Sequence, residues 1–371
     1  MTILIIGAGL SGCVLAQNYA EKGKHVLIIE KRDHIAGNCY DYIDKNGIVV
    51  NKYGPHIFHT KSERVWAYVN RFSKWIPWKH KVYGKYKNHT FPVPINIQTV
   101  NEIYGTNLQS EEEMRAYLES RRSEKEDFTN SETLGRSRFG NELYTAIIEG
   151  YTMKQWDKHP SELDASVVSR IPIRYSFEEG YFNDPYEALP EKGYTEFCRN
   201  MLHDPNIDVR LSTEFSKEFL EENQFELVFY TGPIDLYFKE RGFPMLEYRS
   251  LRFEHETIDR PFFQETSQVN YTDQTIPYTR IIEYKHFLHQ VSEKTTIVKE
   301  YSSKEGEPYY PIPSKRNLDL YSEYKELAKQ EETRGIYFVG RLANYKYFNM
   351  DEAILNALEL FDNLNPNTVG V

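Results

Sequence analysis

The sequence predicts an α/β protein in which a parallel-sheet domain is interrupted by a helical insertion and by an antiparallel β-sheet domain. Three observations predict this fold. Two buried-strand patterns, "TILII" at residues 2–6 and "KHVLIIEKR" at 24–32, flank a glycine-rich turn and a helical run. Further β patterns return at residues 206–215 and 225–238. Residues 245–313 alternate in the manner of an antiparallel sheet.

The glycine-rich turn "GAGLSG" lies directly between the first strand and the helical run "CVLAQNYAEKG". We expect Gly7 to permit the tight turn, Gly9 to let the backbone approach a pyrophosphate, and Gly12 to let the helix pack on the strand. The helix N-terminus offers free N–H groups and a positive dipole to phosphates. Glu30 ends the second strand, where it should accept hydrogen bonds from the adenosine ribose hydroxyls. The pattern therefore predicts a Rossmann-like dinucleotide-binding unit.

The remaining cofactor signals favour FAD over NAD. A second flexible point, Gly37-Asn38, follows the second strand, and "GIYFVGRLANYKYFNMD" near the C-terminus places Gly340 and Arg341 after another strand. Flavoproteins of the glutathione-reductase-like class bring such a Gly-Arg pair back to the FAD phosphates. The helix that opens near Met350 and Asp351 should point its N–H groups toward the flavin. A second G-x-G-x-x-G motif, which a separate NAD(P)H domain would need, does not occur in the sequence.

The segments between these patterns divide the chain further. Residues 80–94 read as a hairpin that turns near Lys87-Asn88, and Ser110 before three glutamates reads as a helix N-cap. We predict a discontinuous Rossmann-like FAD-binding domain, a helical domain with a mobile substrate loop, and an antiparallel sheet domain. Their predicted limits are 1–75, 190–243 and 316–371 for the first, 92–175 for the second, and 76–91, 176–189 and 244–315 for the third.

Composition limits the classes of function. The net charge of −10 and the lack of a basic domain argue against nucleic-acid binding, so an anionic ligand needs a local cluster of arginines. The 29 tyrosines suit a wet cleft for a sugar or nucleotide. Three scattered cysteines, the missing signal-peptide pattern and the lack of any run of about 18 apolar residues favour a cytoplasmic protein without a membrane span.

Two histidines in "GPHIFHT", His56 and His59, follow a Gly-Pro turn. No E-x-x-H motif or nearby Cys/His cluster supplies further ligands, so we expect no metal site. From the residues alone, both a structural role and a role beside a cofactor remain open.

These stretches together resemble the bacterial UDP-galactopyranose mutases, a family of flavin-dependent UDP-sugar mutases. The resemblance is carried by "GAGLSG" with Glu30, "GPHIFHT", "YTMKQW", "SRIPIRYSFEEGYF", "VNYTD", "EPYYPIP" and "GRLANYKYFNMD", in this order across nearly the whole chain. It implies a redox-neutral isomerase that interconverts UDP-galactopyranose and UDP-galactofuranose, the precursor of furanose in surface glycans. Reduced FAD is implied as the nucleophile, through N5, at the anomeric carbon of the sugar. It also implies a homodimer.

The resemblance assigns roles to individual residues. Arg170, with Arg174 as a nearby competitor, and Arg280 would hold the leaving diphosphate, because arginine forks match phosphate oxygens. His59 would lie near the flavin and the sugar, and His56 would orient its loop. The implied cofactor-binding residues are Gly7, Gly9, Ser11, Gly12, Glu30, Lys31, Asn38, His56, Gly340, Arg341, Met350 and Asp351. The implied substrate-binding residues are Tyr151, Trp156, Arg170, Tyr181, Asn270, Arg280, Glu300, Tyr310, Tyr347 and Asn349.

One position departs from the family pattern. Many members carry Asp where this chain has Asn349, and an amide keeps the hydrogen bonding but loses the charge. Three other functions stay open: a mutase for UDP-N-acetylgalactopyranose, an amine-oxidase-like FAD oxidoreductase, and a non-catalytic protein that binds nucleotide sugars. Turnover of the two sugars, oxygen consumption and flavin reduction separate them.

Overall fold

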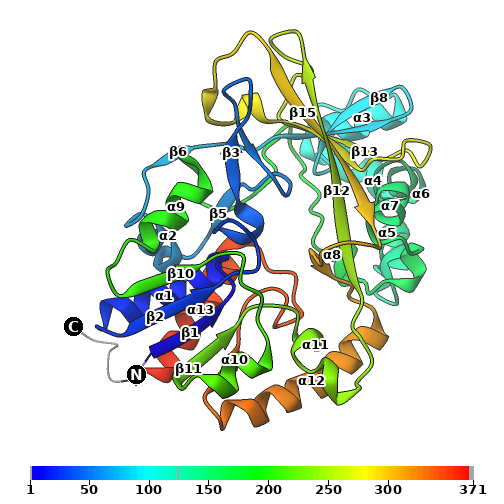
Figure 1. The fold of residues 1–371 in the computed structure, drawn as a ribbon. Coiled ribbons are helices and arrows are strands. Elements are labelled where there is room, and N and C mark those ends of the chain that lie inside the picture. Colours follow the sequence, from blue (N-terminus) through cyan, green and yellow to red (C-terminus); the bar gives the residue numbers. More distant parts are fainter. Residues whose placement is uncertain (1, 123–124, 367–371) are drawn as a thin grey trace.

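A five-stranded parallel sheet forms the lower left of the molecule in the view of Figure 1. The computed structural model describes residues 2–122 and 125–366. The strand order is β10-β2-β1-β11-β17, and every neighbouring pair is parallel. The strands are β1 (Thr2–Ile6), β2 (His25–Ile29), β10 (Ile207–Arg210), β11 (Phe225–Tyr230) and β17 (Ile336–Phe338). Three segments far apart in the sequence thus meet in one sheet, and their carboxyl ends share one edge.

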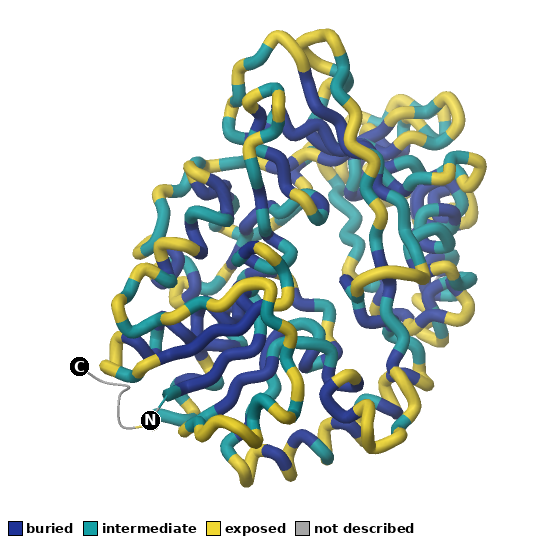
Figure 2. The backbone as a smooth tube through the Cα atoms, viewed as in Figure 1, coloured by how far each residue is buried: buried dark blue, intermediate teal, exposed yellow. Residues whose placement is uncertain are grey.

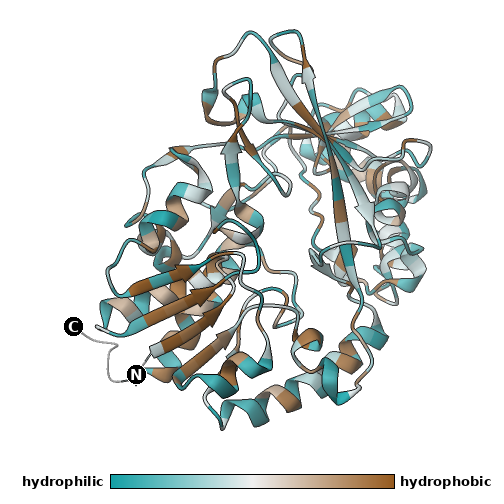
Figure 3. Cartoon of the chain, in the orientation of Figure 1, coloured by the Kyte–Doolittle hydropathy of each residue, from teal (hydrophilic) through white to brown (hydrophobic). Residues whose placement is uncertain are grey.

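Both faces of this sheet are covered by helices, which explains why its central strands β1 and β2 are almost wholly apolar (Figure 3). On one face, Ile3, Ile5, Val26 and Ile28 pack in a core with α1 (Leu10–Glu21), α9 (Gly193–Met201) and α13 (Met350–Leu364). The alternating residues Leu4, Ile6, Leu27 and Ile29 form a second core on the other face. That core includes residues of α10 (Lys217–Glu222), α11 (Ile234–Tyr237) and α12 (Lys315–Glu332). The result is a three-layer α/β/α arrangement, with the central strands β1 and β2 mostly dark blue in Figure 2.

A seven-stranded sheet stands above the parallel sheet in Figure 1, with the order β16-β12-β15-β14-β13-β7-β8. Neighbouring strands are antiparallel except β13 and β7, which pair in parallel. The prediction of an antiparallel sheet is therefore wrong at this one pair and confirmed at the others. These two strands come from distant segments, and no tight turn dictates their direction. The strands are β7 (Val82–Tyr86), β8 (His89–Val93), β12 (Tyr248–Ile258), β13 (Gln268–Tyr271), β14 (Arg280–Glu283), β15 (Thr295–Ser303) and β16 (Tyr310–Pro311). The predicted hairpin that turns at Lys87 is confirmed.

Short helices cover this sheet on the right of Figure 1 and share an apolar core of their own. They are α3 (Ile97–Tyr104), α4 (Glu111–Glu119), α5 (Ser131–Phe139), α6 (Asn141–Leu143) and α8 (Ser166–Ser169). The neighbouring helix α7 (Gly150–Trp156) instead contributes Trp156 to a separate apolar cluster. The predicted N-cap is confirmed, because the Ser110 hydroxyl accepts a hydrogen bond from the Glu113 N–H at 3.2 Å. A π-helical turn, Tyr144–Glu149, leads directly into α7. Such turns are frequent at functional sites because they shift the side chains that follow.

Two small sheets and one helix complete the described chain. β3 (Asp41–Ile43) pairs with β4 (Val49–Asn51), while β9 (Tyr186–Pro190) lies between β5 (Phe58–Thr60) and β6 (Trp75–Pro77). α2 (Glu63–Val69) follows β5, and 3₁₀ turns occupy Gly37–Cys39, Pro160–Glu162, Lys239–Arg241 and Tyr284–His289. Among residues 2–122 and 125–366, no helix has the length and apolar character that crossing a bilayer requires.

Candidate active site

A cavity of ≈ 480 Å³ lies at the carboxyl ends of β1, β2 and β11, which is within the usual size range of ligand sites. The residues expected to bind a cofactor largely gather there. Those that line it are Gly7, Gly9, Ser11, Gly12, Glu30, Lys31, Asn38, His56, Gly340, Arg341 and Met350. Asn349, which was expected to contact substrate, also lines it, whereas Asp351 does not.

The glycine-rich turn has no room for side chains. Gly7 has φ +108°, and a Cβ there would meet the Thr231 hydroxyl oxygen at 2.1 Å. A Cβ on Gly12 would lie 2.0 Å from the Gly7 carbonyl oxygen, and a Cβ on Gly37 would lie 2.9 Å from the Gly9 Cα. Gly9 caps α1 without a side chain, so the free N–H groups of this helix face the cavity. This is the backbone cradle that a pyrophosphate requires.

Glu30 is fixed at the end of β2 by the backbone. It is 7% exposed, and its carboxylate accepts hydrogen bonds from the N–H groups of Ala8 (2.8 Å) and Arg32 (3.0 Å). One carboxylate can accept more than two hydrogen bonds, so capacity remains for ribose hydroxyls. These contacts fit the adenosine end of a dinucleotide.

An ionic contact at the cavity wall was not anticipated from the sequence. Glu307, in the loop between β15 and β16, pairs with Lys31 at 3.0 Å and with Arg32. Arg32 also donates to the Asn38 side-chain oxygen at 3.0 Å. The sequence carried no signal for this contact, because its partners are charged loop residues 275 positions apart. Thr231, by contrast, follows β11 in the turn "TGP". This turn is a local sequence signal for the end of a strand, so the sequence did carry a signal for the position of Thr231.

Aromatic rings and two arginines form a second constellation beside the cavity. The rings of Tyr310 and Tyr347 stack with centroids 5.2 Å apart. Arg170 lies 4.8 Å from the Tyr347 ring, and Arg341 lies 5.4 Å from Tyr347 and 5.8 Å from Tyr310. Trp156 packs in the apolar cluster that these two tyrosines border. Residues from four separate segments therefore meet here.

Arg280 is a third arginine near this constellation, and its side chain is only 17% exposed. Its Nη2 lies 2.7 Å from a Glu300 carboxylate oxygen, and across the sheet it pairs with Asn270. Its Nε is buried and has no hydrogen-bond partner in the described structure. Burial opposes the charged form, but the Glu300 carboxylate outweighs it and raises the pKa of the Arg280 guanidinium above its usual range. A largely buried arginine whose Nε–H has no partner suits an anionic ligand.

The arginines of this site also affect the pKa values of two further tyrosines that were expected in the cleft. Burial raises the pKa of the Tyr151 hydroxyl above its usual value, and the nearby Arg280 opposes the shift. Burial likewise raises the pKa of Tyr181, which Arg170 opposes. Both hydroxyls therefore remain protonated hydrogen-bond donors at neutral pH.

Of the two histidines, His56 is the one that lines the cavity. Burial, together with the positive charge of Arg341, lowers the pKa of His56 to about 4. Its ring is thus neutral at pH 7, and Nδ1 donates a hydrogen bond to the Gly54 carbonyl oxygen at 2.8 Å. That bond leaves Nε2 as an acceptor.

His59 lies on β5 outside the lining of this cavity. Its Nδ1 is 2.5 Å from an Asp184 carboxylate oxygen, and its ring stacks on Phe182 at 3.7 Å. It also lies near Asp351, whose carboxyl pKa burial raises and His59 lowers. The role expected of His59 beside the flavin stays a prediction, whereas His56 has the position that such a role requires.

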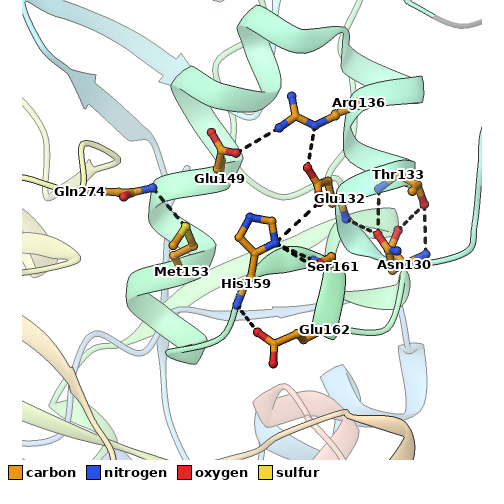
Figure 4. Close-up of polar contacts among 10 residues, drawn as sticks. All are labelled: Asn130, Glu132, Thr133, Arg136, Glu149, Met153, His159, Ser161, Glu162 and Gln274. Atoms are coloured by element: carbon orange, nitrogen blue, oxygen red, sulfur yellow. Dashed lines mark hydrogen bonds and ion pairs between the residues drawn. The ribbon is translucent and has the colours of Figure 1, made fainter.

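A cluster of possible metal ligands lies elsewhere, among the short helices (Figure 4). Side-chain ligand atoms of Glu132, Glu149 and His159 all lie within 4.8 Å of one another. The Arg136 guanidinium contacts both carboxylates, at 2.9 and 3.2 Å, and the His159 Nδ1 accepts a hydrogen bond from the Ser161 N–H. Because one guanidinium already forms ion pairs with both acids, the geometry is that of an ion-pair network.

The fold and the cavity define an α/β protein with a Rossmann-like dinucleotide-binding domain. The sequence profile of the NAD(P)-binding Rossmann-like domain matches residues 5–72, and that of UDP-galactopyranose mutase matches residues 146–347. The chain belongs to the UDP-galactopyranose mutase family and is an isomerase.

Its relatives match along almost their whole length. A probable UDP-galactopyranose mutase of Klebsiella pneumoniae is 40% identical over 97% of this chain and 94% of its own. A dTDP-fucopyranose mutase of Escherichia coli is 36% identical over 96% of both chains. A UDP-galactopyranose mutase of Mycoplasma genitalium is 32% identical over 96% and 93%. The crystal structure of a reduced UDP-galactopyranose mutase shares the fold, with a TM-score of 0.78 at 15% identity over 100% of this chain and 96% of that one.

Proposed function

We propose that this isomerase binds FAD in the main cavity and interconverts UDP-galactopyranose and UDP-galactofuranose beside it. The observation that carries the proposal is the place of Arg341. It lines the dinucleotide cavity, and its guanidinium also lies over the rings of Tyr310 and Tyr347. A cofactor in the cavity and a nucleotide sugar among the tyrosines would therefore be neighbours.

The residues of the cavity fit FAD. The glycine turn and the N-terminus of α1 would hold the pyrophosphate, and Glu30 the adenosine ribose. α13 begins at Met350, which lines the same cavity, so its N-terminal N–H groups are available to the flavin. Reduced FAD, when bound, supplies the nucleophile for the anomeric carbon of the sugar.

The chain's own residues would bind and orient the substrate. Departure of UDP from the anomeric carbon leaves negative charge on the diphosphate, which Arg170 and Arg280 are placed to stabilise. Tyr310 and Tyr347 offer hydroxyl donors to the same oxygens. Glu300 keeps Arg280 fixed, and Asn270 stands opposite it on β13. Their joint effect would be to hold UDP close while the sugar ring opens and recloses.

Several further features belong to this proposal. Residues 157–180, which carry Arg170, would close over the diphosphate and exclude water from the reacting sugar. The enzyme would act in the cytoplasm as a homodimer and supply galactofuranose for surface glycans. His59, through its pairing with Asp184, would help to fix the loop that His56 begins.

The dTDP-fucopyranose mutase relative favours a second candidate substrate, because it is 36% identical over nearly the full length of both chains. The two sugar nucleotides differ in the base, at the 2′-hydroxyl of the ribose and at the C6 hydroxyl of the sugar, and both retain the diphosphate. The arginine and tyrosine cluster would serve either one. Parallel assays with UDP-galactofuranose, dTDP-fucofuranose and UDP-N-acetylgalactofuranose decide between them.

The experiment that tests the proposal follows conversion of UDP-galactofuranose to UDP-galactopyranose by HPLC under anaerobic conditions. The purified protein is assayed oxidised and after reduction with dithionite, with flavin absorbance recorded in parallel. We expect turnover in the reduced sample alone, without net flavin oxidation. No turnover of any of the three sugars by a reduced, FAD-replete protein would refute the proposal, and substrate-driven flavin reduction would indicate an oxidoreductase.

A further inference from the structure

Lys154 is a half-buried lysine in the middle of α7, in the turn after Tyr151. Its ammonium group donates to main-chain carbonyl oxygens of the loop that joins β13 to β14. The distances are 2.6 Å to Tyr271, 2.9 Å to Asp273, 3.0 Å to Ile276 and 3.0 Å to Tyr278. Within the described ranges, no carboxylate forms an ion pair with it. An ammonium has three protons, so four carbonyl acceptors surround it completely.

The loop depends on this cation. Four carbonyl dipoles that converge on one point repel each other and need a donor when they are buried. The rest of the loop is fixed by its own turns, since Asp273 accepts from the Thr275 N–H at 2.9 Å and Tyr271 N–H donates to the Thr279 carbonyl at 2.8 Å. Lys154 thus occupies the place that a bound monovalent cation would take in a carbonyl cage.

The same loop connects two halves of the proposed substrate site. Asn270 lies at one end of it and Arg280 at the other, while Tyr151 lies on the helix that carries Lys154. The helix and loop also touch closely elsewhere: a Cβ on Gly150 would lie 2.3 Å from the Thr272 carbonyl oxygen. Tyr151 and Lys154 are three positions apart and therefore lie on one side of the helix.

We propose that Lys154 is a positioning residue that acts as an internal cation and holds Arg280 and Asn270 in register with Tyr151. This rests on the proposed function, because the contact of Arg280 with the diphosphate is itself proposed. The inference adds that the diphosphate site depends on a positive charge which does not touch the substrate.

The charge of Lys154 is maintained by its surroundings. Burial lowers the pKa of its ammonium to about 8, and Asp273 opposes the shift. The four carbonyl dipoles also favour the charged form, because hydrogen bonds to the ammonium are lost when it is neutralised. At pH 7, below this pKa, the side chain is therefore mostly a cation.

The test removes the ammonium group of Lys154 by substitution and then supplies a free ammonium ion in its place. In the FAD-loaded protein, we expect Lys154→Ala to raise the Kd for UDP about tenfold or more, because a small displacement of an oriented group costs this much. Propylammonium should restore UDP binding, since its length and charge match the deleted side chain, whereas neutral propanol should not. Lys154→Met fills the space of the side chain without its charge. We therefore expect this variant to bind UDP more weakly than the wild type, and propylammonium should not restore its binding. Lys87→Ala, which removes an exposed charge near Asp273, should bind UDP normally.

Amide hydrogen exchange across residues 271–279 provides a readout that needs no substrate. Faster exchange in Lys154→Ala, slowed again by propylammonium, is the expected result. A wild-type Kd in a folded Lys154→Ala protein, or a weakened Kd that no ammonium ion restores, would overturn the proposal. If the wild-type protein itself fails to bind UDP, the proposed function fails, while unchanged exchange in the variant would refute the role of Lys154 independently.

Discussion

Neutral His56 should make the protein sensitive to acid, and the size of the effect follows from its pKa. Burial beside Arg341 lowers that pKa from 6.5 to about 4. The unfolded chain therefore binds a proton as the pH falls below 6.5, while the folded protein does not until about pH 4. Stability is lost in this window, by about 2.5 kcal/mol between pH 7 and pH 4.5, because each unit of pKa difference corresponds to about 1.4 kcal/mol.

His56→Gln isolates this effect, because an amide can still donate to the Gly54 carbonyl but does not titrate. Urea unfolding of nucleotide-free protein at pH 7 and pH 4.5 measures the free energy of unfolding of wild type and variant. We expect the wild type to lose about 2.5 kcal/mol more than the variant over this interval. His89→Gln, at an exposed histidine paired with Glu102, is the matched control and should follow the wild type. Equal losses in wild type and His56→Gln would refute the reasoning.

Three other predictions concern the structure around the site. Gly12→Ala places a Cβ 2.0 Å from the Gly7 carbonyl oxygen, so we expect it to cost more than about 3 kcal/mol and to abolish flavin absorbance in the purified protein. Glu331→Ala removes the carboxylate that lies 2.7 Å from the Arg241 guanidinium, and because the Arg241 side chain is 38% exposed and stays hydrated, urea unfolding should show a loss of only about 1 kcal/mol. All three cysteines are buried, and burial raises the pKa of the Cys39 thiol to about 12, so a thiol reagent at pH 8 should react with them only after denaturation.

Local signals made the nucleotide-binding half of the molecule predictable. The strand, glycine turn, helix and acidic strand end follow one another within about thirty residues, and Gly12 is required there because its Cβ would meet the carbonyl oxygen of Gly7, five residues earlier. The hairpin at Lys87 and the cap at Ser110 are local in the same sense. Their outcome depends on turn chemistry and capping, which the sequence carries directly.

Contacts between distant segments were not predictable in this way. Nothing in "GPHIFHT" states which histidine turns inward, because that choice depends on the pairing of β5 with β9, more than a hundred residues later. Glu307 reaches Lys31 across the cavity, and Lys154 finds its partners in carbonyl groups that no side-chain pattern reveals. The predicted domain limits stay a prediction, since strands and helices of all three parts pack against one another.

The charges of the site explain how an acidic protein can receive a diphosphate. The chain carries a net charge of −10, yet Arg170 and Arg341 meet over the Tyr347 ring without a carboxylate partner among the described residues. Arg280, by contrast, is held by Glu300, and this pair is close to neutral. Removing Glu300 would therefore raise the positive potential of the cleft and also free Arg280 from its fixed place. Tight binding of UDP and correct placement of Arg280 would then no longer go together. We expect Glu300→Gln to bind UDP at least as tightly as the wild type but to turn over the sugar nucleotide more slowly. The reason is that catalysis requires a positive charge in a fixed place rather than a larger positive charge.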